Sequence, residues 1–481
     1  MAVIAELDKT HALMAPGQAS QGVGKGLELY LNSEAAKKVW EESDRVLGFP
    51  FSDLALYGKV NGVVLEGAAA KAEITKTENA QPAVIVTSLA ALAALEEHSL
   101  LGEKRPFWNT GHSVGLIVAM VTSGALDKEG AVKLGDARRK AFKYAIENSP
   151  PSGFLAVQHD KPEVVNQYVE DLTTKYPLRI CLENYDNQIV LGGEIKELEA
   201  AMEYVRGIDS KIATTFARPL VEAAYHHPDF MVLAVPIFGE EVDKIDMQAP
   251  TNGVVVAGSM VEDDGTVRVL ETVADLKTAL KRQPDHPERW RQVIRFLVSQ
   301  GVVKMIELNE SPSLASWSKR MFGGDRESLD LPGVLNSEEK PIAIAWTWKA
   351  ASSPVKVESH ELENGVMEEM NEEVEGLLKQ YGEVDDMEEF LQLPQPQTFG
   401  GMLLWYQKWM ATRRFMKIED VKPDSDFVKD LEGDSLDYEV LRADVEGVYQ
   451  NPVNVEEAEN NTTPRLCAIA TWNKKNRLKA S

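Results

Sequence analysis

The 481-residue sequence has few cysteines, no long apolar run and a shortage of basic residues. Only Cys181 and Cys467 are present, which excludes a disulfide scaffold and makes a reducing cytoplasm the expected setting. The longest apolar stretch, near residues 83–95, is interrupted by Thr87 and Ser88 and is too short to span a bilayer. The first residues lack the basic start and apolar segment of a signal peptide. With 51 Lys and Arg against 76 Asp and Glu, the net charge of −25 disfavours nucleic acids and anionic membranes as partners.

The sequence does contain the pattern of a nucleophile elbow. Gly111-His112-Ser113-Val114-Gly115 follows one short apolar run and precedes another, residues 116–120. Glycines two residues to either side of a serine let the chain turn sharply from strand to helix. The turn exposes the serine hydroxyl and directs the helix N-terminus toward developing negative charge. Ser113 is therefore the candidate nucleophile, although the pentapeptide alone also occurs by chance in long chains.

Five further segments accompany this elbow in a fixed order along the chain. They are the loop Pro16-Gly17-Gln18-Ala19-Ser20-Gln21, the pair Gln81-Pro82, the helix-like run 131–138 ending in Arg138, the run 222–228 containing His226, and Arg282-Gln283 seven residues before Trp290. In this order the pieces closely resemble the malonyl-CoA:acyl carrier protein transacylase family. The resemblance covers about residues 10–322.

The resemblance implies a catalytic role for each matching residue. Ser113 is the nucleophile, His226 is the general base, and Gln18 and the backbone N–H of Val114 form the oxyanion hole. A neutral imidazole must take the serine proton during attack on a thioester and then protonate the departing thiol. The family orients this imidazole with the backbone carbonyl of the residue matching Gln283, so we expect a dyad without the usual carboxylate.

The same resemblance implies a binding site for a diacid. Arg138 holds the malonyl carboxylate, because a guanidinium pairs with two oxygens at once and stays charged when desolvated. Tyr225, next to the base, fits the malonyl-selective members of the family. Ala19 stands where a glycine is usual in the oxyanion loop. Gln81 either lines the substrate pocket or caps the helix that begins near Pro82.

Each assignment has a structural alternative. His227 adjoins His226 and, without the family pattern, is an equal choice for the base. Arg138 opens the basic run Arg138-Arg139-Lys140, which is also typical of a solvated helix face. His112 precedes the nucleophile, but neighbouring residues on an elbow point in different directions, so we expect a structural role for it.

Hydrophobic periodicity predicts an α/β fold with an inserted subdomain. Alternating strands and helices indicate a hydrolase-like acyltransferase core with a mainly parallel sheet, assigned to residues 1–151 and 217–325. Within residues 152–216 the order strand, helix, strand, strand, helix, strand is the ferredoxin-like pattern. The strands are expected near residues 154–157, 178–182, 189–191 and 212, and the helices over 162–173 and 195–205. The resemblance places the active site in the cleft between the acyltransferase core and the ferredoxin-like subdomain.

Beyond residue 322 the likeness to the transacylases ends. Residues 326–398, which are rich in glutamate, are interpreted as an acidic linker or docking region, and residues 341–346 read as a strand. Residues 399–481 resemble an acyl carrier protein, a small helical domain.

The carrier resemblance depends on Asp434-Ser435-Leu436-Asp437, the signature whose serine receives 4′-phosphopantetheine. The alternative is that Ser435 is an ordinary, unmodified helix N-cap. The first helix of this domain is either residues 401–415 or residues 367–381.

Together these features predict an acyltransferase with a seryl-ester intermediate. Malonyl-CoA acylates Ser113, and the phosphopantetheine thiol of an acyl carrier protein, in cis on Ser435 or in trans, accepts the group in fatty acid or polyketide synthesis. A phosphopantetheinyl transferase is an implied partner, and no metal is expected. Two other classes stay open: a serine hydrolase or thioesterase acting on acyl thioesters, and a non-catalytic scaffold that retains the fold.

Overall fold

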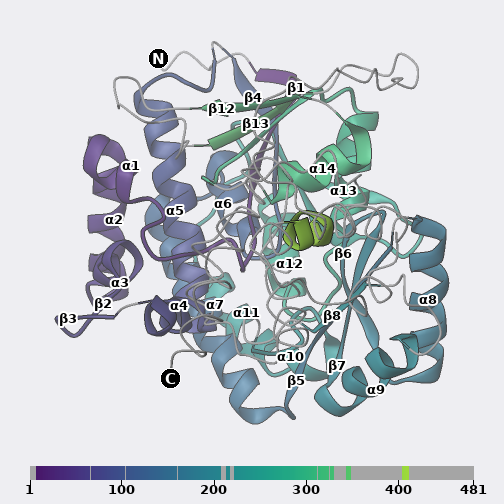
Figure 1. Ribbon diagram of the computed structural model, residues 1–481. Helices are drawn as coiled ribbons and strands as arrows, with labels where there is room; N and C mark the ends of the chain where they lie inside the picture. Colours follow the sequence, from purple (N-terminus) through teal and green to yellow (C-terminus); the bar gives the residue numbers. More distant parts are fainter. Residues whose placement is uncertain are drawn as a thin grey trace, which may run out of the picture. The chain divides into compact units, whose positions relative to one another are not determined.

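The computed structural model describes residues 7–347, except 66, 103, 160, 207–212, 217–221, 311–312, 324 and 330–342, together with a helix at residues 404–410 (Figure 1). The chain divides into two compact units. Met1–Val205 and Phe216–Ala350 form the first, and Arg206–Thr215 and Ala351–Ser481 form the second. All the residues of the site described below belong to the first unit.

The first unit is built around a seven-stranded sheet in the order β10-β9-β4-β1-β11-β13-β12. The strands are β1 (Leu7–Ala15), β4 (Arg105–Gly111), β9 (Val254–Val261), β10 (Val267–Leu270), β11 (Lys304–Glu307), β12 (Asp325–Leu329) and β13 (Ala343–Thr347). The central strands β9, β4, β1 and β11 are parallel, whereas β10, β13 and β12 pair antiparallel at the edges. The prediction of an α/β fold with a mainly parallel sheet is confirmed.

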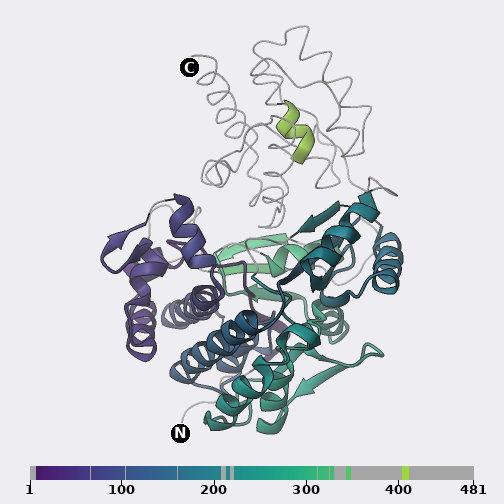
Figure 2. The ribbon, with the colours of Figure 1, turned by 90° about the horizontal axis from the view of Figure 1, so that it is seen from below.

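Helices surround this sheet and fill the connections between its strands (Figures 1 and 2). They are α1 (Leu27–Asn32), α2 (Glu34–Leu47), α3 (Phe51–Tyr57), α4 (Gly67–Thr75), α5 (Thr77–Glu97), α6 (Gly115–Thr122), α7 (Lys128–Asn148), α10 (Pro228–Met231), α11 (Ala234–Lys244), α12 (Val273–Arg282), α13 (Trp290–Ser299) and α14 (Leu314–Phe322). A short hairpin, β2 (Lys59–Val60) and β3 (Val63–Val64), lies outside the sheet. None of the helices in the described ranges is long and apolar enough to cross a membrane.

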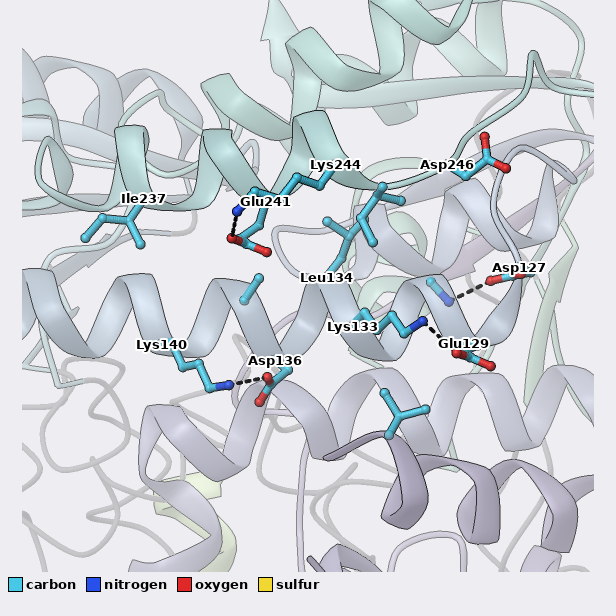
Figure 3. A pocket seen from close by; sticks show the side chains of 14 residues that line it. Asp127, Glu129, Lys133, Leu134, Asp136, Lys140, Ile237, Glu241, Lys244 and Asp246 are labelled. Atoms are coloured by element: carbon cyan, nitrogen blue, oxygen red, sulfur yellow. Dashed lines mark hydrogen bonds and ion pairs between the residues drawn. The ribbon is translucent and has the colours of Figure 1, made fainter. Parts of the chain in front are cut away.

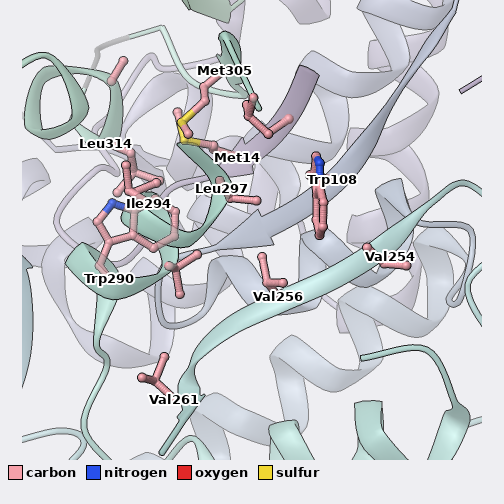
Figure 4. Packing of buried hydrophobic residues seen from close by; sticks show 14 residues of the cluster. Met14, Trp108, Val254, Val256, Val261, Trp290, Ile294, Leu297, Met305 and Leu314 are labelled. Atoms are coloured by element: carbon pink, nitrogen blue, oxygen red, sulfur yellow. The ribbon is translucent and has the colours of Figure 1, made fainter. Parts of the chain in front are cut away.

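The core follows from the alternation of side chains along the central strands. Ala12 and Met14 of β1 share a buried cluster with residues of α13 and α14, including Trp290 (Figure 4). The intervening Leu13 is also buried and points to the opposite face. Helix α6 packs on β1 and β4 directly after the elbow. Strands buried on both faces read as continuous apolar runs, which is the pattern at residues 12–15.

The inserted subdomain has the predicted order of elements. They are β5 (Ser152–Gln158), α8 (Pro162–Lys175), β6 (Arg179–Tyr185), β7 (Gln188–Glu194), α9 (Ile195–Arg206) and β8 (Ala213–Phe216). The four strands form one sheet in the order β6-β7-β5-β8, with β7 antiparallel to both of its neighbours. This strand order is that of a ferredoxin-like fold.

The assignment of residues 326–398 to a linker needs correction at its start. Strands β12 and β13 continue the main sheet, and β13 pairs antiparallel with β11. Without them β11 would be an edge strand with unpaired backbone groups, and a returning hairpin removes that edge. The core therefore extends past residue 325 to Thr347.

Most of the predicted carrier-like region lies outside the described residues, including Ser435 and the alternative first helix at 367–381. Residues 404–410 are helical and fall within the other alternative, 401–415.

Candidate active site

Ser113 lies in a tight turn between β4 and α6, at the carboxyl end of the parallel strands. Its φ of 51° is in the left-handed region, as a nucleophile elbow requires. Both flanking glycines are needed because the chain doubles back on itself. A Cβ at Gly111 would overlap the backbone of Gly115, and a Cβ at Gly115 would overlap the carbonyl oxygen of Ala15. The glycine spacing seen in the sequence thus reflects close backbone contacts.

His226 reaches Ser113 from a loop 113 residues further along the chain. Its Nε2 lies 2.8 Å from Ser113 Oγ, and the His226 side chain is almost fully buried. The backbone N–H of His226 donates to the Pro284 carbonyl at 2.9 Å, and its φ is 62°. A non-glycine residue in this conformation has to be held by its surroundings, and the segment at residues 283–286 holds this one.

The other ring nitrogen of His226 determines its tautomer. Nδ1 lies 2.8 Å from the Gln283 carbonyl oxygen and 3.2 Å from the His286 carbonyl oxygen. Carbonyl oxygens only accept hydrogen bonds, so Nδ1 carries the proton and Nε2 is free to accept one from Ser113. Backbone carbonyls occupy the place that a carboxylate fills in a triad.

Arg138 joins the pair from α7. Its Nη2 donates to Ser113 Oγ at 3.3 Å and its Nε donates to Gln283 Oε1 at 3.0 Å. The guanidinium lies 4.0 Å from the centre of the Phe142 ring, and only 1% of Arg138 is exposed. The alternative of a solvated helix face fails for Arg138. Its neighbours Arg139 and Lys140 instead pair with Asp136.

Gln283 connects all three residues, Ser113, His226 and Arg138. Its carbonyl accepts from His226, its Oε1 accepts from Arg138, and its Nε2 donates to the Ser113 carbonyl. The sequence pattern assigned a role only to the Gln283 carbonyl. The side-chain bonds could not be seen from spacing, because they depend on how α7 and α12 pack around the elbow.

Burial sets the charges of this site. Desolvation, together with the nearby Arg138 and His112, lowers the pKa of His226 to about 3, so its imidazole is neutral at pH 7. Desolvation also lowers the pKa of Arg138 to about 9, partly offset by Tyr225 and Glu288. The guanidinium keeps its charge at neutral pH. The site therefore presents a neutral base and a buried cation. Among the described residues, no carboxylate forms an ion pair with this cation at hydrogen-bonding distance.

The predicted oxyanion donors come from two segments, the loop after β1 and the start of α6. The loop containing Gln18 follows β1, which pairs directly with β4, and the His112 N–H donates to Ala15 O at 3.0 Å. Val114 is the N-cap of α6, where a backbone N–H precedes the helical hydrogen bonds. The side chain of Gln18 donates to Thr77 Oγ1 at 3.4 Å rather than to Ser113. The neighbouring Ala19 has a φ of 83°, which explains why glycine is usual there.

Thr77 and Tyr225 form a second polar pair beside the base. Their hydroxyl groups are hydrogen-bonded to each other, and the Thr77 N–H donates to Glu222 at 2.6 Å. Tyr225 packs against Phe142 and Phe154. Sequence reasoning missed Thr77, because a threonine at a helix start carries no signal of its own.

Three residues with open alternatives can now be placed. Gln81 lies inside α5, which begins at Thr77, so the capping alternative is wrong; its amide is fully buried and finds no hydrogen-bond partner among the described residues. His227 caps α10 by accepting from the Asp229 N–H and does not contact Ser113. His112 packs between Trp290 and Trp317 and hydrogen-bonds Asn184, as its expected structural role requires.

A separate cavity of about 830 Å³ runs along the outer side of α7 (Figure 3). It is lined from α7 and α11 by charged residues that pair with one another, such as Lys133 with Glu129 and Lys244 with Glu241. None of the residues assigned to catalysis lines it. In the described ranges no group of His, Cys, Asp and Glu is arranged to hold a metal ion.

The chain is similar in sequence to known acyl transferases. The family described as "Acyl transferase domain" matches residues 14–269. The malonyl CoA-acyl carrier protein transacylase of Bacillus subtilis is 30% identical over 314 residues, covering 64% of this chain and 90% of the relative. The enzyme of the same name from Salmonella typhimurium is 25% identical over 327 residues, covering 68% of this chain and 97% of that protein.

Solved structures show the same likeness. The malonyl CoA-acyl carrier protein transacylase from Clostridium perfringens is 27% identical with a TM-score of 0.54, covering 65% of this chain and 90% of that one. MCAT from Mycobacterium tuberculosis is 25% identical with a TM-score of 0.54, covering 64% of this chain and 92% of that one.

Proposed function

Because the chain belongs to the acyl transferase family, we propose that it moves a malonyl group from coenzyme A to the phosphopantetheine thiol of an acyl carrier protein. One observation carries this proposal. Ser113 Oγ lies 2.8 Å from the His226 imidazole and 3.3 Å from the Arg138 guanidinium. A nucleophile, a base and a cation for a free carboxylate thus meet at one buried oxygen.

The first half of the reaction uses the His226 tautomer. Nε2 takes the Ser113 proton as Oγ attacks the thioester carbonyl, forming a tetrahedral oxyanion. The N–H groups of Val114 and the Gln18 loop would stabilise that oxyanion, and loss of one such donor typically costs about 3 kcal/mol. Collapse breaks the C–S bond, His226 protonates the departing thiolate, and coenzyme A leaves a malonyl ester on Ser113.

The second half reverses these steps with a different thiol. His226 removes the proton from the pantetheine thiol, the sulfur attacks the ester carbonyl, and Ser113 Oγ leaves with the proton returned by His226. The protons and the malonyl group are exchanged only among the two substrates, Ser113 and His226. The carrier leaves as a malonyl thioester.

Arg138 explains why a malonyl group suits the site. A buried guanidinium gains most from a ligand that brings a compensating carboxylate. Arg138 also lowers the pKa of His226. A bound carboxylate would cancel that effect and raise the basicity of His226 when the correct acyl group is present.

The C-terminal region supplies the acceptor in the fullest form of this proposal. Its support is the Asp434-Ser435-Leu436-Asp437 sequence, with 4′-phosphopantetheine attached to Ser435 by a phosphopantetheinyl transferase. A tethered carrier would have an effective concentration in the millimolar range if the linker spans the distance. Intact mass after co-expression with a phosphopantetheinyl transferase tests this, with Ser435→Ala as the matched control. If the mass is the same with and without the phosphopantetheinyl transferase, Ser435 is not modified and the acceptor must be a separate carrier protein.

A transfer assay tests the main proposal against its two alternatives. Labelled malonyl-CoA is mixed with the full chain and a separate phosphopantetheinylated carrier protein, and label on the carrier and free malonate are both measured. Transfer predominates if the proposal is right, and Ser113→Ala abolishes it. Rapid release of malonate without the carrier would indicate a thioesterase, and absence of both products would indicate a scaffold.

A further inference from the structure

The carboxyl group of Glu288 is buried beside the active site, and the proposed reaction does not use it. Its backbone is fixed to β6: the Glu288 N–H donates to Cys181 O at 2.8 Å, and the Glu288 carbonyl accepts from the Glu183 N–H at 2.9 Å. Only 1% of the residue is exposed. The carboxyl is therefore held away from solvent by a fixed backbone.

The carboxyl occupies a space that a glycine provides. A Cβ at Gly258 of β9 would overlap Glu288 Oε1, so a larger residue there would displace it. The backbone N–H groups of Ser113 and Gly258 face the carboxyl and lower its pKa. Within the part of the chain that the structure describes, Oε1 itself has no donor in hydrogen-bonding geometry. The Glu288 carboxyl therefore faces the backbone of the elbow and not the Ser113 hydroxyl group.

Arg138 is the charged group that acts on this carboxyl. Glu288 raises the pKa of Arg138, and Arg138 lowers that of Glu288. The remaining charged groups on the neighbouring elements are satisfied elsewhere. On β6, Glu183 pairs with Arg289 and Arg291, and in the loop before α13, Asp285 pairs with His286.

Burial outweighs these favourable contacts and raises the pKa of Glu288 to about 8. At pH 7 most molecules therefore hold a neutral carboxylic acid next to a charged guanidinium. Ionisation above pH 8 places a second negative charge where a substrate carboxylate is expected to bind.

We infer that Glu288 tunes the carboxylate site at Arg138: it is protonated when a carboxylate-bearing acyl group is bound, and its ionisation weakens that binding. This inference rests on the proposed function. If Arg138 pairs with the malonyl carboxylate, a solvent proton must join Glu288 whenever binding occurs in the alkaline range. Glu288 is a specificity-determining residue in this scheme and does not touch the reacting atoms.

The test is malonyl-CoA binding to the full chain carrying Ser113→Ala, which prevents acylation. Calorimetry at pH 7 and pH 9 should show the dissociation constant rising about twentyfold. About tenfold arises because only about a tenth of Glu288 is protonated at pH 9, and about twofold because about half of Arg138 has lost its proton at that pH. Adding Glu288→Gln should reduce the rise to about twofold, the part due to Arg138 itself. Acetyl-CoA, which has no free carboxylate, should show neither change.

Two controls separate this effect from a loss of structure. Glu307→Gln removes another fully buried carboxyl, one whose pKa is raised by burial and whose partners are at the start of α14. This variant should leave the twentyfold rise intact. Proton uptake at pH 8, measured in buffers of different ionisation enthalpy, needs no Glu288 variant and should be about half a proton per malonyl-CoA bound.

The outcomes distinguish the two proposals. Equal pH profiles with and without Glu288→Gln, or no proton uptake at pH 8, overturn the inference and leave the proposed function standing. The same twentyfold change for acetyl-CoA also overturns it, because the effect would not involve the carboxylate. If malonyl-CoA binds no better than acetyl-CoA at pH 7, the proposed function fails as well.

Discussion

Gln283 shows how much the site depends on single side chains. Three of its groups hold the base, the cation and the elbow at once. The sequence pattern predicted that Ser113, His226 and Arg138 belong to one site, and the structure brings them together. Glu288 and Thr77 could not be predicted, because neither follows a motif and both owe their importance to neighbours from distant segments.

At the residue scale, the role of Arg138 predicts a change in acyl preference. Arg138→Ala should reduce kcat/KM for malonyl-CoA roughly 100-fold, or about 3 kcal/mol, as is typical when one partner of a buried charge pair is removed. Acetyl-CoA should lose only a few-fold. Arg138→Lys is the matched control, because lysine keeps the positive charge but lacks the planar fork. Its kcat/KM for malonyl-CoA should lie between that of the natural sequence and that of Arg138→Ala. A similar loss for both substrates would mean that Arg138 only supports Ser113.

At the scale of elements, the central strands and the subdomain followed from hydrophobic alternation and turn residues. The linker boundary did not, because residues 325–329 and 343–347 become strands only by pairing with each other and with β11. Strand pairing between distant segments cannot be predicted from local sequence. The elbow, in contrast, could be predicted from local sequence. Its two glycines are needed because β4, α6 and the end of β1 are in close backbone contact there.

The elbow predicts a contrast between two glycines. Gly115→Ala should destabilise the chain by about 2 kcal/mol and abolish acylation, because the new methyl group overlaps the Ala15 carbonyl. Gly239→Ala, inside α11 with its nearest neighbour at 3.8 Å, should be neutral or stabilising by about 0.5 kcal/mol. Urea denaturation and an acylation assay measure both. An active, fully stable Gly115→Ala variant would contradict the close approach.

At the scale of the whole molecule, three buried histidines couple folding to pH. Desolvation lowers the pKa of His112 and of His227 to about 4, and that of His226 to about 3. The unfolded chain binds more protons than the folded chain between about pH 4 and pH 6.5. The free energy of unfolding therefore decreases as the pH falls through this window. Glu288 acts in the opposite direction, because it keeps its proton in the fold up to about pH 8.

This coupling predicts that His227→Asn is less sensitive to acid than the natural sequence. When the pH is lowered from 7 to 5, each of the three buried histidines should reduce the free energy of unfolding by about 2 kcal/mol. Asparagine can still accept a hydrogen bond from the Asp229 N–H but does not titrate. The free energy of unfolding of the variant should therefore fall by about 2 kcal/mol less than that of the natural sequence over the same pH range. Urea midpoints at the two pH values measure the difference. Equal losses in both proteins would show that the protonation of His227 is not linked to folding.

The central claim is that Ser113 is acylated with the help of His226. Rapid mixing with malonyl-CoA, acid quenching and peptide mass spectrometry test it most directly. We predict one malonyl group on the peptide containing Ser113, none in Ser113→Ala, and acylation at least 100-fold slower in His226→Ala, in line with the typical contribution of a general base. A malonyl group on another residue, or undiminished labelling of the Ser113→Ala chain, would contradict the account.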